Sequence, residues 1–155
     1  MKSVIDSTVV IQIAIVVRDI EETKKKWAEF LGLPVPPTTD AGTYEVAQTW
    51  YNGGPAPKAN CLLAFFKVGT DVTLEFLQPN GYPSVWQDHL DKVGEGIQHI
   101  AFGVKGIDDK IVACEKFGMK LVQKGFFREA DGCYAYMDAN DSLKITLELL
   151  EFYNQ

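Results

Sequence analysis

The sequence has few cysteines and no long apolar run, and each shortage excludes a class of protein. The three cysteines, Cys61, Cys114 and Cys133, are odd in number and show neither a CxxC pair nor zinc-ribbon spacing. We therefore expect reduced thiols in a cytoplasmic protein, with Cys114 in the core of a helix. No apolar stretch approaches the roughly 20 residues that a membrane span needs. Asp6 also interrupts the N-terminal stretch where a signal peptide would be apolar, so we expect no membrane partner.

An excess of basic residues is missing as well. Lys and Arg number 15 against 21 Asp and Glu, which gives a net charge of −6. The one basic cluster, Lys24–Lys26, follows two glutamates and is interpreted as the solvated face of a helix. We therefore expect no nucleic acid partner. An acidic protein does not attract anionic substrates by its overall field, so local groups or a metal would have to hold one.

Two pairs of segments repeat along the chain. The segment 12–20, QIAIVVRDI, aligns with 99–107, HIAFGVKGI, and the segment 72–77, VTLEFL, aligns with 145–150, ITLELL. A repeat of this kind indicates duplicated structural units. The sequence therefore predicts a single α+β domain over 1–155, with half one at about 8–79, a linker helix at about 80–96 and half two at about 97–152.

Each half is predicted to follow the order βαβββ. The expected strands lie at 9–17, 33–38, 60–68, 71–78, 97–104, 119–127, 133–138 and 144–151, with 33–38 at most an edge strand because it contains three prolines.

Capping residues mark the expected helices. Asp19 with Glu22 begins the first helix and Gly32 ends it, and Ser84 with Gln87 begins the linker helix. The residues expected on the buried face of the first helix are Ile20, Trp27, Phe30 and Leu31. The second half is expected to have its helix at 107–117.

Four polar residues occupy matching positions on these strands. Because strand side chains alternate between faces, Gln12 and His99 are expected opposite the helix, and so are Glu75 and Glu148. If the halves pack about a pseudo-twofold axis, the four side chains converge. Two buried carboxylates need a cation or must be protonated. A divalent metal, Zn, Ni, Co, Mn or Fe, suits this donor set.

These segments resemble the vicinal oxygen chelate superfamily, which includes glyoxalase I, methylmalonyl-CoA epimerase, extradiol dioxygenases and bleomycin-resistance proteins. The likeness covers about residues 10–151. It implies two βαβββ modules in an open eight-stranded barrel-like sheet with helices outside, and it places the metal ligands at Gln12, Glu75, His99 and Glu148. That set is similar to the zinc-type glyoxalase I pattern, whereas the linker looks more like the epimerases. Extradiol dioxygenases have His where this chain has Gln12, which disfavours that activity.

The resemblance implies a divalent-metal-dependent isomerase or lyase that removes a proton next to a carbonyl. Glu148 is the expected base and Glu75 the second choice. The substrate would be a small molecule, such as a CoA thioester or a thiol hemithioacetal, and the protein a homodimer. The alternative is a non-catalytic small-molecule-binding protein of the antibiotic-resistance type.

Five further residues are also considered for the site. Glu45 is a candidate for an additional base. Arg128 would either grip an anionic group or lie on the surface. Trp50, Tyr51 and Trp86 would line a substrate pocket or belong to the core, and the core is the favoured interpretation.

Overall fold

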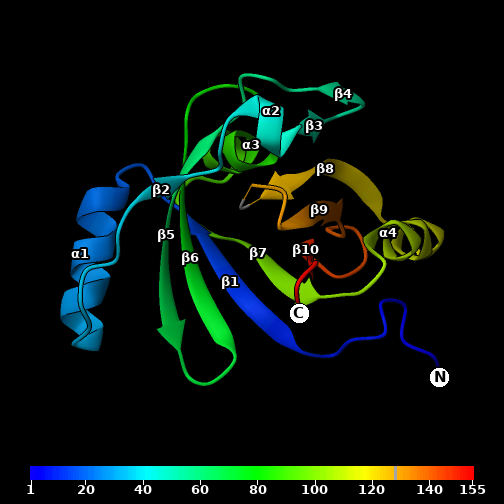
Figure 1. The fold of residues 1–155 in the computed structure, drawn as a ribbon, viewed down its shortest axis with the longest axis horizontal. Coiled ribbons are helices and arrows are strands. Elements are labelled where there is room, and N and C mark those ends of the chain that lie inside the picture. The colour runs from blue at the N-terminus through cyan, green and yellow to red at the C-terminus, as the bar shows by residue number, and fades with distance from the viewer. Residues whose placement is uncertain (128) are drawn as a thin grey trace.

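One curved, mixed sheet organises the protein (Figure 1). The computed structural model describes residues 1–127 and 129–155. The described strands are β1 (Val10–Val16), β2 (Thr39–Asp40), β3 (Trp50–Tyr51), β4 (Gly54–Pro55), β5 (Cys61–Val68), β6 (Val72–Pro79), β7 (Gly96–Gly103), β8 (Lys120–Phe127), β9 (Gly132–Asp138) and β10 (Thr146–Phe152). The described helices are α1 (Ile20–Leu31), α2 (Tyr44–Ala47), α3 (Val85–Lys92) and α4 (Ile107–Lys116).

The sheet order shows the duplication. It runs β2-β5-β6-β1-β7-β10-β9-β8-β3-β4, with β1 parallel to β6, β7 parallel to β10, and β1 antiparallel to β7. The β1–β7 seam therefore joins two equivalent half-sheets within one chain. The predicted α+β class and the two βαβββ modules are confirmed.

The structure has ten described strands rather than the eight predicted. The predicted strand at 33–38 is wrong, because Pro34, Pro36 and Pro37 have no N–H to donate, and pairing begins only at the two-residue β2. The loop after it adds β3 and β4, and β3 pairs with β8 of the other half. The long insertion of half one thus extends the far edge of half two.

The α1 helix begins and ends as predicted, and of the four residues expected on its buried face all but Phe30 pack against the core. Asp19 accepts a hydrogen bond from the Glu22 backbone at 2.9 Å, and Gly32 closes the helix with a φ of 67°. Phe30, predicted to be buried, is 81% exposed. It lies ten residues after Ile20, which at 3.6 residues per turn turns it about 80° away from the face that Ile20 and Ala28 bury.

Equivalent residues hold the start of each large helix to its own half-sheet. Gln78 lies three residues after Glu75, and its side-chain oxygen accepts from the Ile20 backbone at 2.9 Å. Glu151 lies three residues after Glu148, and its carboxylate accepts from Gly106 and Ile107, each at 2.9 Å. The last strand of each half therefore both caps a helix and carries a predicted ligand.

Three apolar clusters fill the molecule. One lies between α1 and its half-sheet, one between α4 and its half-sheet, and the third lies between the halves on the opposite face. The three cysteines are free and buried, with Cys114 on the packed face of α4 as predicted. Within the described ranges, the helices are too short or too polar to cross a bilayer.

Candidate metal centre

Sheet register brings the four predicted side chains to one point. At the β1–β7 seam, Ala14 pairs with His99, and on its other side Ala14 pairs with Glu75 of β6. Ala101 likewise pairs with Gln12 and with Glu148 of β10.

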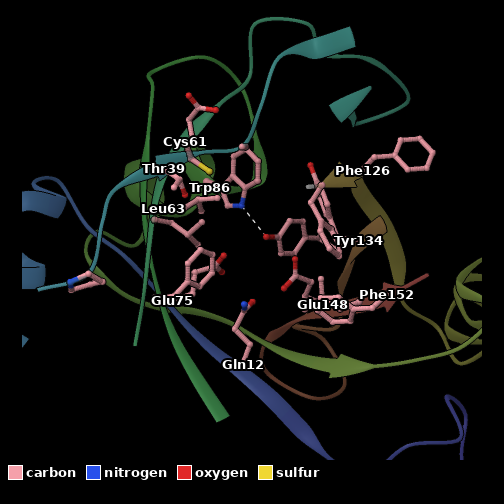
Figure 2. Close-up of a pocket in the computed structure, with 18 of the residues that line it drawn as sticks. Gln12, Thr39, Cys61, Leu63, Glu75, Trp86, Phe126, Tyr134, Glu148 and Phe152 are labelled. Atoms are coloured by element: carbon pink, nitrogen blue, oxygen red, sulfur yellow. Dashed lines mark hydrogen bonds between the residues drawn. The ribbon is translucent and has the colours of Figure 1, made fainter. Parts of the chain in front are cut away.

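In each of these two rows across the sheet, one small alanine therefore separates two polar side chains, Glu75 from His99 and Gln12 from Glu148. The two rows are neighbours on the same face of the sheet. Figure 2 shows Gln12 between Glu75 and Glu148, all three reaching into a cavity.

The four polar groups are in contact, and three of them are buried, while Gln12 is half-buried. His99 Nε2 lies 3.0 Å from Glu148 Oε2, 3.5 Å from Glu75 Oε2 and 3.3 Å from Gln12 Oε1. His99 is fully buried, and the two glutamates are 7% and 4% exposed, respectively. One donor atom from each of Glu75, His99 and Glu148 lies within 4.8 Å of the other two, a spacing that a single metal ion can span. Their role as metal ligands stays a prediction.

The Gln12 amide can face this cluster in two ways. With its nitrogen turned inward, it donates to Glu75 Oε2 at 3.1 Å and to Glu148 Oε2 at 2.8 Å. With its oxygen turned inward, three oxygens and one imidazole nitrogen surround a common centre. The first arrangement is satisfied by hydrogen bonds alone, whereas the second requires a cation. The donor set therefore fits a divalent metal, with Gln12 as the ligand that turns.

Neighbouring side chains fix the His99 ring. Nδ1 contacts the side-chain oxygen of buried Gln98. The ring also packs edge-on against Tyr136, with 4.9 Å between centroids. A partner on Nδ1 sets the orientation of an imidazole, and here it directs Nε2 at the carboxylates.

Burial and contact with opposite charge shift the pKa values of His99 and Glu75 in opposite directions. Burial by itself lowers the pKa of His99, but Glu148 and Glu75 together raise it to about 9. Burial also raises the pKa of Glu75, and contact with His99 only partly offsets this. Without a metal, His99 is therefore protonated at neutral pH and balances one of two acids. A divalent cation carries the charge that would balance both.

The cluster forms the floor of a cavity of about 500 Å³. Its walls are mostly aromatic and aliphatic. The lining residues are Gln12, Pro36, Pro37, Thr39, Asp40, Ala41, Cys61, Leu63, Phe65, Glu75, Leu77, Trp86, Phe126, Phe127, Tyr134, Tyr136, Glu148, Leu150 and Phe152.

Three hydrogen bonds stiffen the wall beside the cluster. Trp86 Nε1 donates to the Tyr136 hydroxyl at 3.0 Å (Figure 2). Fully buried Gln123 accepts from the Val85 backbone at 2.9 Å and donates to the Tyr134 hydroxyl at 3.3 Å. Helix α3 is thereby held against strands β8 and β9.

Sequence reasoning placed some wall residues and missed others. Trp86 is buried in the core, as favoured, and it also lines the cavity. Tyr134 and Tyr136 were missed, and the signal for them was their alternation on a strand whose residues are otherwise apolar or small.

The other candidates lie elsewhere. Trp50 and Tyr51 form β3, outside the described cavity wall, and Tyr51 donates to Asp88. Glu45 is exposed on α2 and does not line the described cavity, so the structure does not support it as an additional base. Arg128 lies outside the described residues.

Comparison with known proteins gives one family and one fold. The family model for the Glyoxalase/Bleomycin resistance protein/Dioxygenase superfamily matches residues 11–137. None of the curated proteins matches.

Solved structures share the fold at low identity. Methylmalonyl-CoA epimerase from Mycobacterium tuberculosis is 19% identical, with a TM-score of 0.66 over 97% of this chain and 91% of the other. The Streptomyces coelicolor epimerase in complex with 2-nitronate-propionyl-CoA is 20% identical, with a TM-score of 0.65 over 94% and 97%. A hypothetical protein from Bacillus halodurans is 19% identical, with a TM-score of 0.65 over 95% and 96%.

Proposed function

The chain belongs to the Glyoxalase/Bleomycin resistance protein/Dioxygenase superfamily, and from that premise we propose that it is a divalent-metal-dependent isomerase or lyase. Its reaction is the removal of a proton from a carbon next to a carbonyl, followed by return of the proton to the same or a neighbouring carbon. One observation carries the proposal: Gln12 meets the buried side chains of Glu75, His99 and Glu148 at the floor of a cavity.

The four residues would hold the cation through an amide oxygen, an imidazole nitrogen and two carboxylates. When bound, the cation would polarise the substrate carbonyl and stabilise the negative charge that develops on its oxygen. His99 is oriented for this role by Gln98 and Tyr136. Gln12 would present its oxygen, and its amide would turn when the cation is removed.

A carboxylate at the cavity floor would move the proton. Glu148 and Glu75 both border the cavity, so either can reach a substrate carbon above the floor. We assign Glu148 as the base and Glu75 as the second choice. The mostly apolar walls exclude water from the site, which protects a carbanionic intermediate from unwanted protonation.

A second function, binding without turnover, is favoured by the shape of the cavity. A pocket of about 500 Å³ with mostly apolar walls is of the size that holds a drug-like molecule. A binding protein of this fold would sequester such a molecule. The presence of a metal and of proton exchange separates the two functions.

Solvent deuterium exchange tests the proposal. The protein, loaded in turn with Zn²⁺, Ni²⁺, Co²⁺, Mn²⁺ or Fe²⁺, is incubated in D₂O with 2-methylmalonyl-CoA or with the hemithioacetal of methylglyoxal and glutathione. These represent the CoA thioester and thiol hemithioacetal classes. We expect exchange by the loaded protein and a loss of at least about 100-fold in Glu148→Gln, the usual range for removing a general base.

Glu151→Gln is the matched control, because Glu151 lies on the same strand but caps α4. It should retain the wild-type exchange rate. Stoichiometric metal without exchange into either compound would favour the binding function. The predicted homodimer is a separate matter, which sedimentation equilibrium of the same protein resolves.

A further inference from the structure

The Tyr136 hydroxyl lies beside the four-residue cluster but is not one of the predicted ligands. We propose that Tyr136 is a further catalytic residue, which donates a hydrogen bond to the substrate oxygen on which negative charge develops when the base removes the proton. This assignment rests on the proposed function, since it concerns the same cavity and the same reaction.

Sheet register places Tyr136 next to the expected base. Tyr136 on β9 pairs with Glu148 on β10, and Glu148 pairs in turn with Ala101 on β7. Side chains that are paired in this way project from the same face of a sheet, with their Cβ atoms about 4.5–5.5 Å apart. Tyr136 therefore extends the row of polar side chains by one strand, and both Tyr136 and Glu148 border the cavity.

The Tyr136 ring is held on several sides. It packs edge-on against His99, with 4.9 Å between centroids, and against Trp86 at 6.1 Å. Tyr134 lies at 5.3 Å, and Tyr136 is only 2% exposed. A ring enclosed in this way keeps one orientation, so its hydroxyl group is already in place before a substrate binds.

The hydrogen bond from Trp86 leaves the hydroxyl proton of Tyr136 available. An indole N–H can only donate, so the Tyr136 oxygen is the acceptor of the 3.0 Å bond from Trp86 Nε1, which is the dashed line in Figure 2. Among residues 1–127 and 129–155, the Tyr136 proton itself has no acceptor. Because Tyr136 borders the cavity, an oxygen of a bound molecule can accept this proton.

The proposed reaction creates such an acceptor. When Glu148 takes the proton, the electrons of the C–H bond form a double bond to the carbonyl carbon, and the carbonyl electron pair moves onto the oxygen. That oxygen is two bonds from the carbon that loses the proton, so a donor to it should lie next to the base, as Tyr136 does.

The hydrogen bond from Tyr136 should act mainly on the transition state. A hydrogen bond to an ionised acceptor is roughly twice as strong as one to a neutral acceptor. The bond to the substrate oxygen therefore strengthens as charge develops there, while the proton stays on Tyr136. An interaction that is stronger in the transition state than in the bound substrate raises kcat and changes KM little.

Tyr136→Phe tests this assignment, because it removes the hydroxyl group and keeps the ring against His99. In the deuterium exchange assay, kcat of Tyr136→Phe should fall at least about tenfold, while KM stays within about twofold of the wild-type value. Tyr51→Phe is the control, since Tyr51 donates to Asp88 outside the described cavity wall. It should retain the wild-type kcat. Elemental analysis should find equal zinc in all three proteins.

A binding measurement gives a second readout that does not need turnover. The acetohydroxamate anion is planar and has two adjacent oxygens, like the charged form of the substrate that the reaction creates. Isothermal titration calorimetry with zinc-loaded protein should show at least tenfold weaker binding to Tyr136→Phe than to the wild type, about 1.4 kcal/mol, and unchanged binding to Tyr51→Phe. If Tyr136 only packs against His99, the affinity of Tyr136→Phe stays at the wild-type value.

The outcomes separate the role of Tyr136 from the proposed function. An unchanged kcat or an unchanged acetohydroxamate affinity in Tyr136→Phe would overturn the role of Tyr136, even when the wild type exchanges deuterium. If the wild type exchanges neither compound but Tyr136→Phe binds acetohydroxamate more weakly as expected, Tyr136 stands as the donor and the isomerase or lyase function fails. A wild type that binds neither zinc nor acetohydroxamate would overturn both.

Discussion

Replacing Glu148 by Gln should remove most of the stabilisation that a divalent metal gives to the folded protein. Glu148 Oε2 lies 3.0 Å from His99 Nε2 and at 2.8 Å from the Gln12 amide, so it belongs to the centre of the cluster. Gln keeps the size of the side chain and one oxygen but removes the negative charge. A ligand that binds only the folded state stabilises that state by mass action.

The magnitude follows from the affinity and the size of the chain. At a free Zn²⁺ concentration 100-fold above its dissociation constant, the wild type gains about 2.7 kcal/mol. For a domain of this length, that gain corresponds to a rise in Tm of about 5–11 °C. Loss of a charged ligand should weaken metal binding at least about 100-fold. At the same Zn²⁺ concentration, the variant would then gain only about 0.4 kcal/mol, or about 1 °C.

Differential scanning fluorimetry measures these shifts, with chelator and with Zn²⁺, for the wild type, Glu148→Gln and Glu151→Gln. Elemental analysis of the same samples gives the metal content. Glu151→Gln should melt lower than the wild type under both conditions and show the full metal-dependent rise, because the Glu151 carboxylate accepts its hydrogen bonds from the start of α4. An undiminished rise and equal metal content in Glu148→Gln would refute the ligand assignment.

Three further predictions concern the fold. The Gly106 and Ile107 backbone N–H groups lower the pKa of Glu151, so the stability it contributes is present above about pH 4.5 and is lost as the pH falls through its lowered pKa. Urea unfolding should therefore show Glu151→Gln about 1 kcal/mol less stable than the wild type at pH 7, and equally stable at pH 2. In the same urea unfolding experiment, Phe76→Ala should lower the free energy of unfolding by about 3–5 kcal/mol, because Phe76 is fully buried. Phe30→Ala should change it by less than about 0.5 kcal/mol, and an equal effect of the two substitutions would contradict the exposed position of Phe30. Gly132→Ala should lower the free energy of unfolding, measured by thermal unfolding, by at least about 1–3 kcal/mol, because the new Cβ would lie 2.4 Å from the backbone oxygen of Glu151. An unchanged stability would mean that β9 and β10 can separate at this point.

Local features of the fold were predictable from short stretches of sequence. Asp19 and Ser84 cap their helices as expected, since a cap depends on residues three positions apart. Strand alternation likewise indicated that Glu75 and Glu148 face away from the helices. The internal repeat then indicated which strands correspond, and hence which four residues could share a site.

Other features depended on the whole structure. Phe30 is apolar, as a helix core residue would be, but it lies beside the stripe of α1 that Ile20 and Ala28 bury against the sheet. The pairing of β3 with β8 joins segments about 70 residues apart that share no pattern. The aromatic residues that line the cavity come from five elements, β5, α3, β8, β9 and β10. Of these residues, only Trp86 was considered from the sequence as a pocket residue.

By itself the sequence determined the two modules, their caps and the identity of four polar residues on inward-facing strand positions. Only the tertiary structure decided that these four meet, through the register that sets Ala14 beside His99 and Ala101 beside Gln12. The physical reason is the range of the interactions involved. Alternation and capping act between near neighbours in the chain, whereas the register of two strands almost 90 residues apart is fixed by the packing of the entire core on both faces of the sheet.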